Sequence, residues 1–499
     1  MGTIRKQTII SSILVYIGFI IGALNTYFYV KNGLFTSEQF GITRIFFDFA
    51  QNMAAFGTLG VVPVIYKFYP YYKDNLEKHR IDLITWAMLA AGIGLLLVII
   101  AGWYFRPIFV AQFYQKSELI VKYYYWLFPF TLGMLFFNVL EGLCWAVNKT
   151  VVSSFLKETV LRIITLVFIL LFYAKLISFD SFIYGFAFLY IIIFIILAAY
   201  LYKEGALFFP AIVSRVTKKF WKKMLAMQVL IYSGTVIASI AATIDSFIIA
   251  KFQGLAVVGV FALAQYAANL LQVPQRSIVA VSAGVLSRAW KDKNLPEIRR
   301  IYKRSCINLL LMALVIFGNL WLNIADAIQV FDVQQEYSAG LNTIFVLGMV
   351  RIIDAGTGLN AMVINTSTFW RFDFFSGVIL LILRLPLTYY LIKHYGIIGS
   401  AFAELAAYGV YNFIRYEFLR RKFNMQPFDL KTLWAIMVTM LAFATSYFLF
   451  RGVIGWWAMI GRSVIFSSIM IAAIFKLKLT PDAAQLYQIF KLRIGKGGN

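Results

Sequence analysis

The chain has 499 residues, of which 61% are hydrophobic and 14% are charged, and its mean hydropathy is +0.79. Soluble globular proteins carry about 25% charged residues, so this composition excludes an ordinary soluble domain. The formal net charge of +24 would suit a nucleic-acid-binding protein, but the cations are spread between long apolar runs. Composition therefore indicates an integral membrane protein and argues against nucleic acid as a partner.

Apolar runs long enough to cross ~30 Å of hydrocarbon as helices fill the chain from end to end. We expect an all-α protein with about fourteen transmembrane helices. The expected spans are residues 8–30, 39–66, 81–103, 121–147, 151–173, 180–202, 224–250, 255–287, 301–323, 338–364, 372–392, 397–419, 430–450 and 456–475.

Lysine and arginine are distributed unevenly between the two sides of this predicted topology. With the N-terminus inside, the inner segments carry about 31 of the 46 basic residues and the outer connections about 8. This asymmetry follows the positive-inside rule and places both termini in the cytoplasm. The longest basic interruption, residues 203–223, is predicted either to lie along the inner membrane surface or to be a solvated loop.

A weak internal repeat recurs at a spacing near 218 residues. The sequence at 40–42 recurs at 258–260, and the sequence at 160–163 recurs at 382–385 with a slightly larger offset. Six spans separate corresponding points, so the two copies enter the membrane in the same direction. The repeat predicts two six-helix lobes related by a pseudo-twofold axis along the membrane normal.

This repeat sets the expected division of the chain. We expect an N-lobe at 1–202, a basic cytoplasmic linker at 203–223, a C-lobe at 224–422, and two further helices with a basic tail at 423–499. The two lobes would enclose a central cavity, and rocking of one lobe against the other would give alternating access.

Several arginines fall inside the predicted spans. A guanidinium near the bilayer centre costs at least ~3 kcal/mol and keeps its proton, so it is retained only where it faces a protein-lined, hydrated space. Arginine also grips phosphate oxygens with paired, charge-assisted hydrogen bonds. The candidate cations of a cavity that binds an anionic substrate are Arg44, Arg162, Arg276, Arg351 and Arg384.

The alternative is that each arginine pairs with an acid on its own helix. Arg44 has Asp48 at i+4, Arg351 has Asp354 at i+3, and Arg162 follows Glu158 by four residues. Arg384 has no acid at such a spacing and is the clearest candidate for a role in the cavity.

Acidic residues inside the spans form a second candidate set. A buried carboxylate can bind a proton or a sodium ion and couple transport to an ion gradient. The candidates are Asp48, Glu141, Asp245 and Asp354, while Glu158 and Glu404 also fall inside spans. The alternative is that these acids only balance the arginines. The sequence contains no nucleotide-binding loop and no metal-ligand cluster, so no cofactor is expected beyond a coupling H⁺ or Na⁺.

The chain resembles a polysaccharide or O-antigen flippase (Wzx-like) of the multidrug/oligosaccharidyl-lipid/polysaccharide (MOP) exporter superfamily. The similarity rests on the number of spans, both ends inside, the basic middle segment, and the sequence FGITR at 40–44 followed by GTLG at 57–60. It implies transport of an undecaprenyl-diphosphate-linked oligosaccharide from the inner to the outer leaflet of a bacterial inner membrane. Membrane lipids, a polysaccharide polymerase and chain-length proteins are the implied partners.

Two other functions stay open at this stage. A cation-coupled multidrug exporter of the same superfamily would share the fold, but its cargo is usually cationic and suits an arginine-rich cavity poorly. A membrane-integral polymerase or glycosyltransferase acting on lipid-linked sugars would need more than the short outer connections seen here. We therefore expect a transporter and not an enzyme, with a lipid II flippase as a narrower variant.

Overall fold

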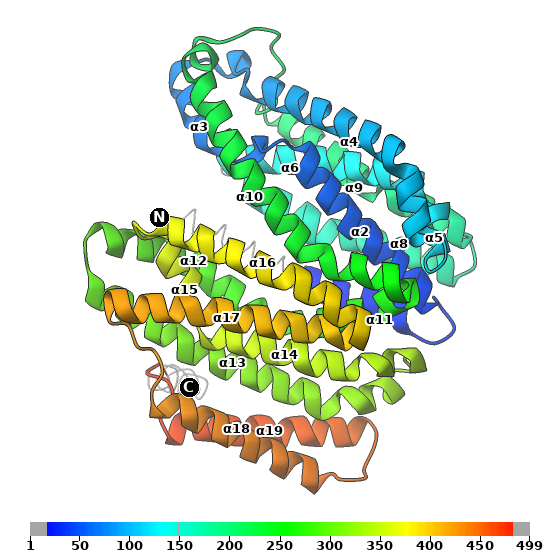
Figure 1. Ribbon diagram of the computed structural model, residues 1–499, viewed down its shortest axis with the longest axis vertical. Coiled ribbons are helices and arrows are strands. Elements are labelled where there is room, and N and C mark those ends of the chain that lie inside the picture. The colour runs from blue at the N-terminus through cyan, green and yellow to red at the C-terminus, as the bar shows by residue number, and fades with distance from the viewer. Residues whose placement is uncertain (1–16, 148, 483–499) are drawn as a thin grey trace, which may run out of the picture. The chain divides into compact units, whose positions relative to one another are not determined.

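The computed structural model describes residues 17–147 and 149–482, and this part of the chain is built from helices joined by short connections (Figure 1). The beginning of the first expected span, Asn148 and most of the basic C-terminal tail lie outside the described residues. Two compact units divide the chain, Met1–Gly259 and Val260–Asn499.

The first unit contains the helices of the N-terminal half and the long helix α10. Its helices are Ile17–Val30, α2 (Ser37–Gly57), α3 (Val61–Asn75), α4 (Leu83–Phe113), α5 (Glu118–Lys122), α6 (Leu127–Ala146), α7 (Thr150–Phe155), α8 (Leu161–Tyr173), α9 (Phe179–Lys203) and α10 (Arg215–Gln253). Short 3-10 turns at Lys78–Arg80 and Tyr124–Trp126 precede α4 and α6. A π-helical turn at Leu156–Val160 joins α7 to α8.

The second unit contains the remaining helices, and α11 runs across the boundary between the units. Its helices are α11 (Leu255–Asn269), α12 (Val273–Lys291), α13 (Leu295–Val330), α14 (Leu341–Gly356), α15 (Asn360–Asn365), α16 (Trp370–Tyr395), α17 (Ile397–Phe423), α18 (Leu430–Leu449) and α19 (Trp456–Lys476). Short 3-10 turns at Leu270–Gln272 and Gln335–Gly340 precede α12 and α14. Helices α18 and α19 pack against each other and against α13 (Figure 1).

Eleven helices in the described residues are long and apolar enough to cross a membrane, or twelve when the bent pair α2 and α3 counts as one span. The all-α, multi-pass membrane fold is therefore confirmed, whereas the expected number of fourteen spans is not. Two expected spans are missing from this count for local reasons. The first helix is described only over Ile17–Val30, and the fifth span carries three charged residues close together, Lys157, Glu158 and Arg162.

The GTLG sequence at 57–60 is the bend between α2 and α3.

 The break of 50° follows from two consecutive left-handed residues, Leu59 at φ +47° and Gly60 at φ +75°, which no helix can continue through. At its other end α2 begins with a capping box, in which Thr36 and Gln39 satisfy each other's backbone N–H groups. The sequence thus fixes where this span starts and where it bends.

The basic linker is shorter than expected, because residues 215–223 form the first turns of α10. Lysine and arginine are good helix formers, so their charge alone does not distinguish a loop from the cytoplasmic extension of a helix. Ser214 caps α10 by accepting a hydrogen bond from the backbone N–H of Thr217. Helix α10 packs on α2 and α3, so the compact units divide at Gly259 and Val260 rather than at the linker.

Helices α2 and α11 approach closely at a pair of glycines. A Cβ atom on Gly41 would lie 2.0 Å from the backbone oxygen of Leu255, and a Cβ atom on Gly259 would lie 2.3 Å from the backbone oxygen of Ser37. Two pairs of residues at this contact are separated by the repeat spacing of 218 residues. These pairs are Ser37 with Leu255 and Gly41 with Gly259. The division into repeated lobes stays a prediction.

Candidate functional site

Two of the five candidate arginines meet at one carboxylate in the second unit. Arg351 on α14 donates to Glu404 on α17 at 2.8 Å, and Arg384 on α16 lies 3.5 Å from the other carboxylate oxygen of Glu404. The exposed fractions of Arg351, Arg384 and Glu404 are 7%, 6% and 1%. The carboxylate of Asp354 also acts electrostatically on Arg351, so the charges of two guanidiniums and two acids interact in this cluster.

Polar and aromatic side chains surround this cluster. Arg351 also donates to the side-chain oxygen of Asn269 on α11 at 3.2 Å. The ring of Tyr408, one turn after Glu404 on α17, lies 5.9 Å from the guanidinium carbon of Arg351 and 6.0 Å from that of Arg384. The negative face of an aromatic ring attracts cations at such distances, so Tyr408 helps to hold both arginines in place.

The structure corrects the pairing expected for Arg351. Its acidic partner is Glu404 on a different helix, whereas Asp354 accepts hydrogen bonds from Gln275 at 3.2 Å and from Asn412 at 3.3 Å. Arg384, which has no acid at helical spacing, is also next to Glu404. Spacing within one helix cannot reveal partners from another helix, and this is why both pairs were missed.

The cluster continues along α17 as a row of polar side chains. Asn412 accepts hydrogen bonds from Thr357 at 3.0 Å and from Asn360 at 2.9 Å. Arg415 forms an ion pair with Asp373 and donates to Ser376 at 3.0 Å. The row was missed in the sequence, although its signal is there: its members recur every three to four residues on one helix face. These residues are Glu404, Tyr408, Tyr411, Asn412 and Arg415.

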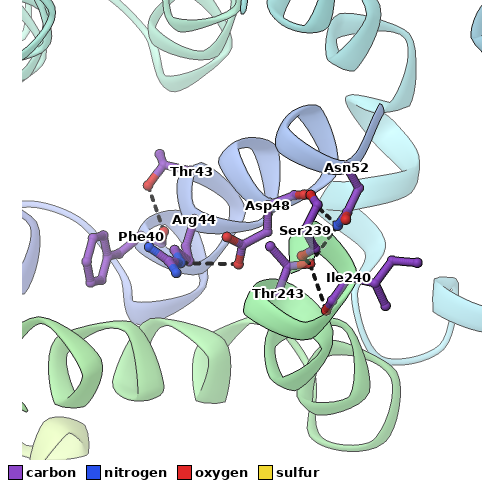
Figure 2. A network of polar contacts seen from close by, with 8 residues as sticks. All are labelled: Phe40, Thr43, Arg44, Asp48, Asn52, Ser239, Ile240 and Thr243. Atoms are coloured by element: carbon purple, nitrogen blue, oxygen red, sulfur yellow. Dashed lines mark hydrogen bonds and ion pairs between the residues drawn. The ribbon is translucent and has the colours of Figure 1, made fainter. Parts of the chain in front are cut away.

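Arg44 belongs to a separate network in the first unit, between α2 and α10. It donates to Asp48 at 3.2 Å on the next turn of α2, as its i+4 spacing predicts. Figure 2 shows Asn52, one further turn along, reaching Thr243 on α10, and these two side chains are 2.6 Å apart. Thr243 in turn donates to the backbone oxygen of Ser239 at 2.9 Å. Polar contacts therefore join α2 to α10 inside the unit.

Two carboxylates of the candidate ion-coupling set come together in this network. Asp48 and Asp245 have exposed fractions of 2% and 1%, and Asp245 on α10 is close enough to repel the charge of Asp48 electrostatically. Asp48 also forms a side-chain hydrogen bond with Ser246, the residue after Asp245. Two buried carboxylates near one arginine are the kind of site at which a proton or a monovalent cation can bind.

Arg162 lies in the first turn of α8, directly after the π-helical turn. It donates to Glu158 at 2.9 Å, and its guanidinium carbon lies 5.1 Å from the ring centre of Phe19 on the helix Ile17–Val30. A Cβ atom on Gly18 would lie 2.2 Å from the backbone oxygen of Glu158, so the helices touch at this turn. The side chain of Arg162 is 27% exposed, and its pairing with Glu158 is the alternative that the spacing predicted.

The remaining candidates lie elsewhere. Glu141 on α6 accepts from Lys157 at 2.9 Å, a partner that the sequence did not single out. Arg276 is exposed in the first turn of α12, after Pro274. The structure thus brings together Arg351 and Arg384 in the second unit, and Arg44, Asp48 and Asp245 in the first.

A chain with many membrane-spanning helices and ionic clusters buried between them has the form of a membrane transporter, because such charges inside a membrane are costly and are usually functional. Residues 4–290, more than half of the chain, match the family described as polysaccharide biosynthesis protein, and the chain therefore belongs to this family. No match was found among curated proteins.

Solved structures with the same fold include a lipid II flippase and multidrug transporters. The lipid II flippase MurJ in an inward closed conformation has a TM-score of 0.76 and 14% identity, and the match covers 94% of this chain and 99% of that chain. An inward-facing multidrug resistance MATE family transporter of the MOP superfamily has a TM-score of 0.64 and 15% identity, with coverage of 83% and 98%. The resemblance to a polysaccharide family predicted from the sequence is confirmed by the family match, and the flippase and the multidrug transporter share the fold of this chain.

Proposed function

We propose that the chain is a flippase for an undecaprenyl-diphosphate-linked oligosaccharide, which it moves from the inner to the outer leaflet by alternating access. The observation that carries this proposal is the pair of buried guanidiniums, Arg351 and Arg384, that come from two helices and meet at Glu404. Membership of a polysaccharide biosynthesis family and the fold shared with a lipid II flippase support the same class of cargo.

The chemistry of the cluster fits a diphosphate. Each guanidinium can donate two parallel hydrogen bonds to phosphate oxygens, and these bonds are strengthened by charge. An arriving phosphate competes with Glu404 for the two arginines, so the acid holds them in position until the substrate binds. Unpaired phosphate charge and sugar hydroxyls are costly in hydrocarbon, and a polar path lowers that barrier. The polyprenyl chain remains in the lipid.

The direction of transport follows from the membrane potential. A negative potential inside the cell favours outward movement of an anion by ~2.3 kcal/mol per charge per 100 mV. We place the helices in the inner membrane of a bacterium and both termini in its cytoplasm, because this orientation puts most lysine and arginine residues on the cytoplasmic side. Asp48 and Asp245 would bind the coupling H⁺ or Na⁺ if the gradient of such an ion also drives transport.

A translocation assay with Arg384→Ala tests this function. We expect at least a tenfold loss of flipping of a labelled undecaprenyl-diphosphate glycan in reconstituted vesicles, measured by its accessibility to a membrane-impermeant lectin. Arg451→Ala, at an exposed arginine, is the control and should transport normally. Normal transport by correctly folded Arg384→Ala would remove the cluster from the substrate site.

The same vesicles distinguish a flippase from a multidrug exporter. We expect the wild-type protein not to transport a cationic dye, because the two buried guanidiniums favour an anionic cargo. The dye should also not compete with the lipid-linked glycan. Dye transport driven by an ion gradient, with no flipping of the glycan, would favour the exporter.

A further inference from the structure

A groove in the first unit lies between α3, α4 and the beginning of α10. Its cavity volume is about 520 Å³, and its walls are mostly apolar. Ile65 comes from α3, Trp86 and Ala90 come from α4, and Trp221 and Leu225 come from α10. Ligand pockets commonly have volumes of about 300–1,000 Å³, so the groove is large enough for part of a small molecule or a lipid chain.

A buried aspartate holds the helices that form this groove. Asp82, just before α4, is fully buried and accepts hydrogen bonds from the backbone N–H of Ser214 at 2.9 Å and from the hydroxyl of Thr217 at 2.7 Å. The indole N–H of Trp86 donates to the same carboxylate at 3.1 Å, and Tyr72 on α3 lies 2.8 Å from the Thr217 hydroxyl. These bonds fix the beginning of α10 beside α3 and α4, so hydrogen bonds hold the walls of the groove in place.

One end of the groove is strongly basic. The sequence between Glu204 and Asp245 contains no acidic residue, whereas the first turns of α10 carry five cations. Lys218 lines the groove itself, and Lys222 lies over the ring of Trp221 at 5.6 Å. Trp86 and Trp221 are 42% and 48% exposed, as expected of aromatic residues at a membrane interface. An apolar slot that opens beside lysines matches a molecule with an apolar chain and an anionic head.

The length of the groove matches one leaflet of a membrane. Its lining on α10 runs from Thr217 to Gln228. Eleven residues of α-helix rise by about 16 Å, and half of the ~30 Å hydrocarbon thickness is about 15 Å. The positive-inside rule places the basic end of α10 at the cytoplasmic surface.

We propose that this groove binds one acyl chain of an anionic phospholipid from the cytoplasmic leaflet, with the lipid phosphate next to Lys218 and Lys222. Anionic lipids of this leaflet attract clusters of lysine and arginine, which accounts for the acid-free beginning of α10. The site is distinct from the Arg351–Arg384 cluster and does not depend on the identity of the transported cargo.

Native mass spectrometry of the purified full-length protein tests the proposal. Phosphatidylglycerol and phosphatidylcholine with identical acyl chains are added in equal amounts, and the retained lipid is counted. We expect the wild-type protein to retain phosphatidylglycerol at least fivefold more than phosphatidylcholine. Ala90→Phe, which fills the groove, should lose the retained lipid, whereas Leu97→Phe, at an exposed position further along α4, should keep it.

A second variant does not depend on the folding of Ala90→Phe. Lys218 and Lys222 are exposed, so Lys218→Gln with Lys222→Gln should fold normally and lose the preference for phosphatidylglycerol while retaining phosphatidylcholine. Equal retention of the two lipids by the wild-type protein, or an unchanged preference in the double variant, would overturn the proposal. The proposal would also be overturned if inorganic phosphate alone displaced the lipid. The same holds if an undecaprenyl-diphosphate glycan displaced it and excess phosphatidylglycerol did not.

Discussion

At the scale of single residues, the acids of the second unit matter because of the arginines that they hold. Glu404 is almost inaccessible and faces Arg351 and Arg384 from two other helices. Burial of an ion pair costs desolvation, and removal of one partner leaves the other charge uncompensated. In the proposed function a bound phosphate would replace the charge of Glu404, so stability and substrate binding would oppose each other in this cluster.

Glu404→Gln separates these two effects. Because two guanidiniums would be left without their carboxylate, we expect a loss of about 3–5 kcal/mol in the free energy of unfolding, seen as a lower midpoint of thermal unfolding in detergent. Added lipid-linked diphosphate should raise this midpoint more in the variant than in the wild-type protein. Glu417→Gln, at a surface ion pair of the same helix, is the control and should cost less than about 1 kcal/mol. Equal effects of the two substitutions would contradict the role of Glu404.

The sequence showed which of these residues are inside the membrane but not which of them meet. Arg44 with Asp48, and Arg162 with Glu158, were predictable because both members lie on consecutive turns. The pairs of Arg351 and Arg384 with Glu404 depend on how α14, α16 and α17 pack, and an apolar sequence specifies this packing only weakly.

At the scale of helices, contacts between backbones need residues without side chains. Gly41 on α2 and Gly259 on α11 each leave no room for a Cβ atom beside the backbone oxygen of the other helix. Small residues at such crossings are common in membrane proteins, because they allow helices to approach closely. The repeat predicted from the sequence drew attention to both glycines, while the contact itself could be seen only in the structure.

Alanine substitutions test this crossing. Gly41→Ala and Gly259→Ala should each destabilise the protein by about 1–3 kcal/mol, because the added methyl group would push the helices apart. Gly409 on α17 is the control, since a Cβ atom there meets nothing within 4 Å. Gly409→Ala should be neutral or stabilising by up to about 1 kcal/mol, as expected from helix propensity. Thermal unfolding in detergent measures all three, and a loss in Gly409→Ala as large as in Gly41→Ala would rule out the close contact as the cause.

An exposed ion pair joins the ends of two helices of the first unit. Lys149, before α7, donates to Glu204, after α9, at 2.8 Å, and this bond lowers the pKa of the Glu204 carboxyl. The folded-state pKa lies below the unfolded value of about 4.3, so the stabilisation is complete above pH ~4.3 and is lost as the pH falls through the folded pKa. Glu204→Gln should therefore flatten the pH dependence of the unfolding midpoint below pH ~4.3, and Glu77→Gln is the exposed control. An unchanged profile in Glu204→Gln would show that the pair contributes nothing.

At the scale of the whole molecule, the class of protein could be predicted because hydropathy and the distribution of charge act over the entire chain. The end of the basic linker could not be predicted, since the cations of residues 215–223 fit a loop as well as the helix α10 that they form. The side of the membrane on which each connection lies is predicted from the distribution of charge alone, because the same fold could be inserted in either direction.

Labelling of single cysteines tests this sidedness. The two natural cysteines, Cys144 and Cys306, are free and buried, so they should react slowly with a charged, membrane-impermeant maleimide. Lys291→Cys, at the exposed end of α12, is expected on the cytoplasmic side, and Arg451→Cys, between α18 and α19, on the outer side. When only the outer membrane has been made permeable, Arg451→Cys should be labelled and Lys291→Cys should not. Lys291→Cys should react once the inner membrane is permeabilised as well. The opposite order would invert the topology, and with it the direction in which the membrane potential drives an anionic cargo.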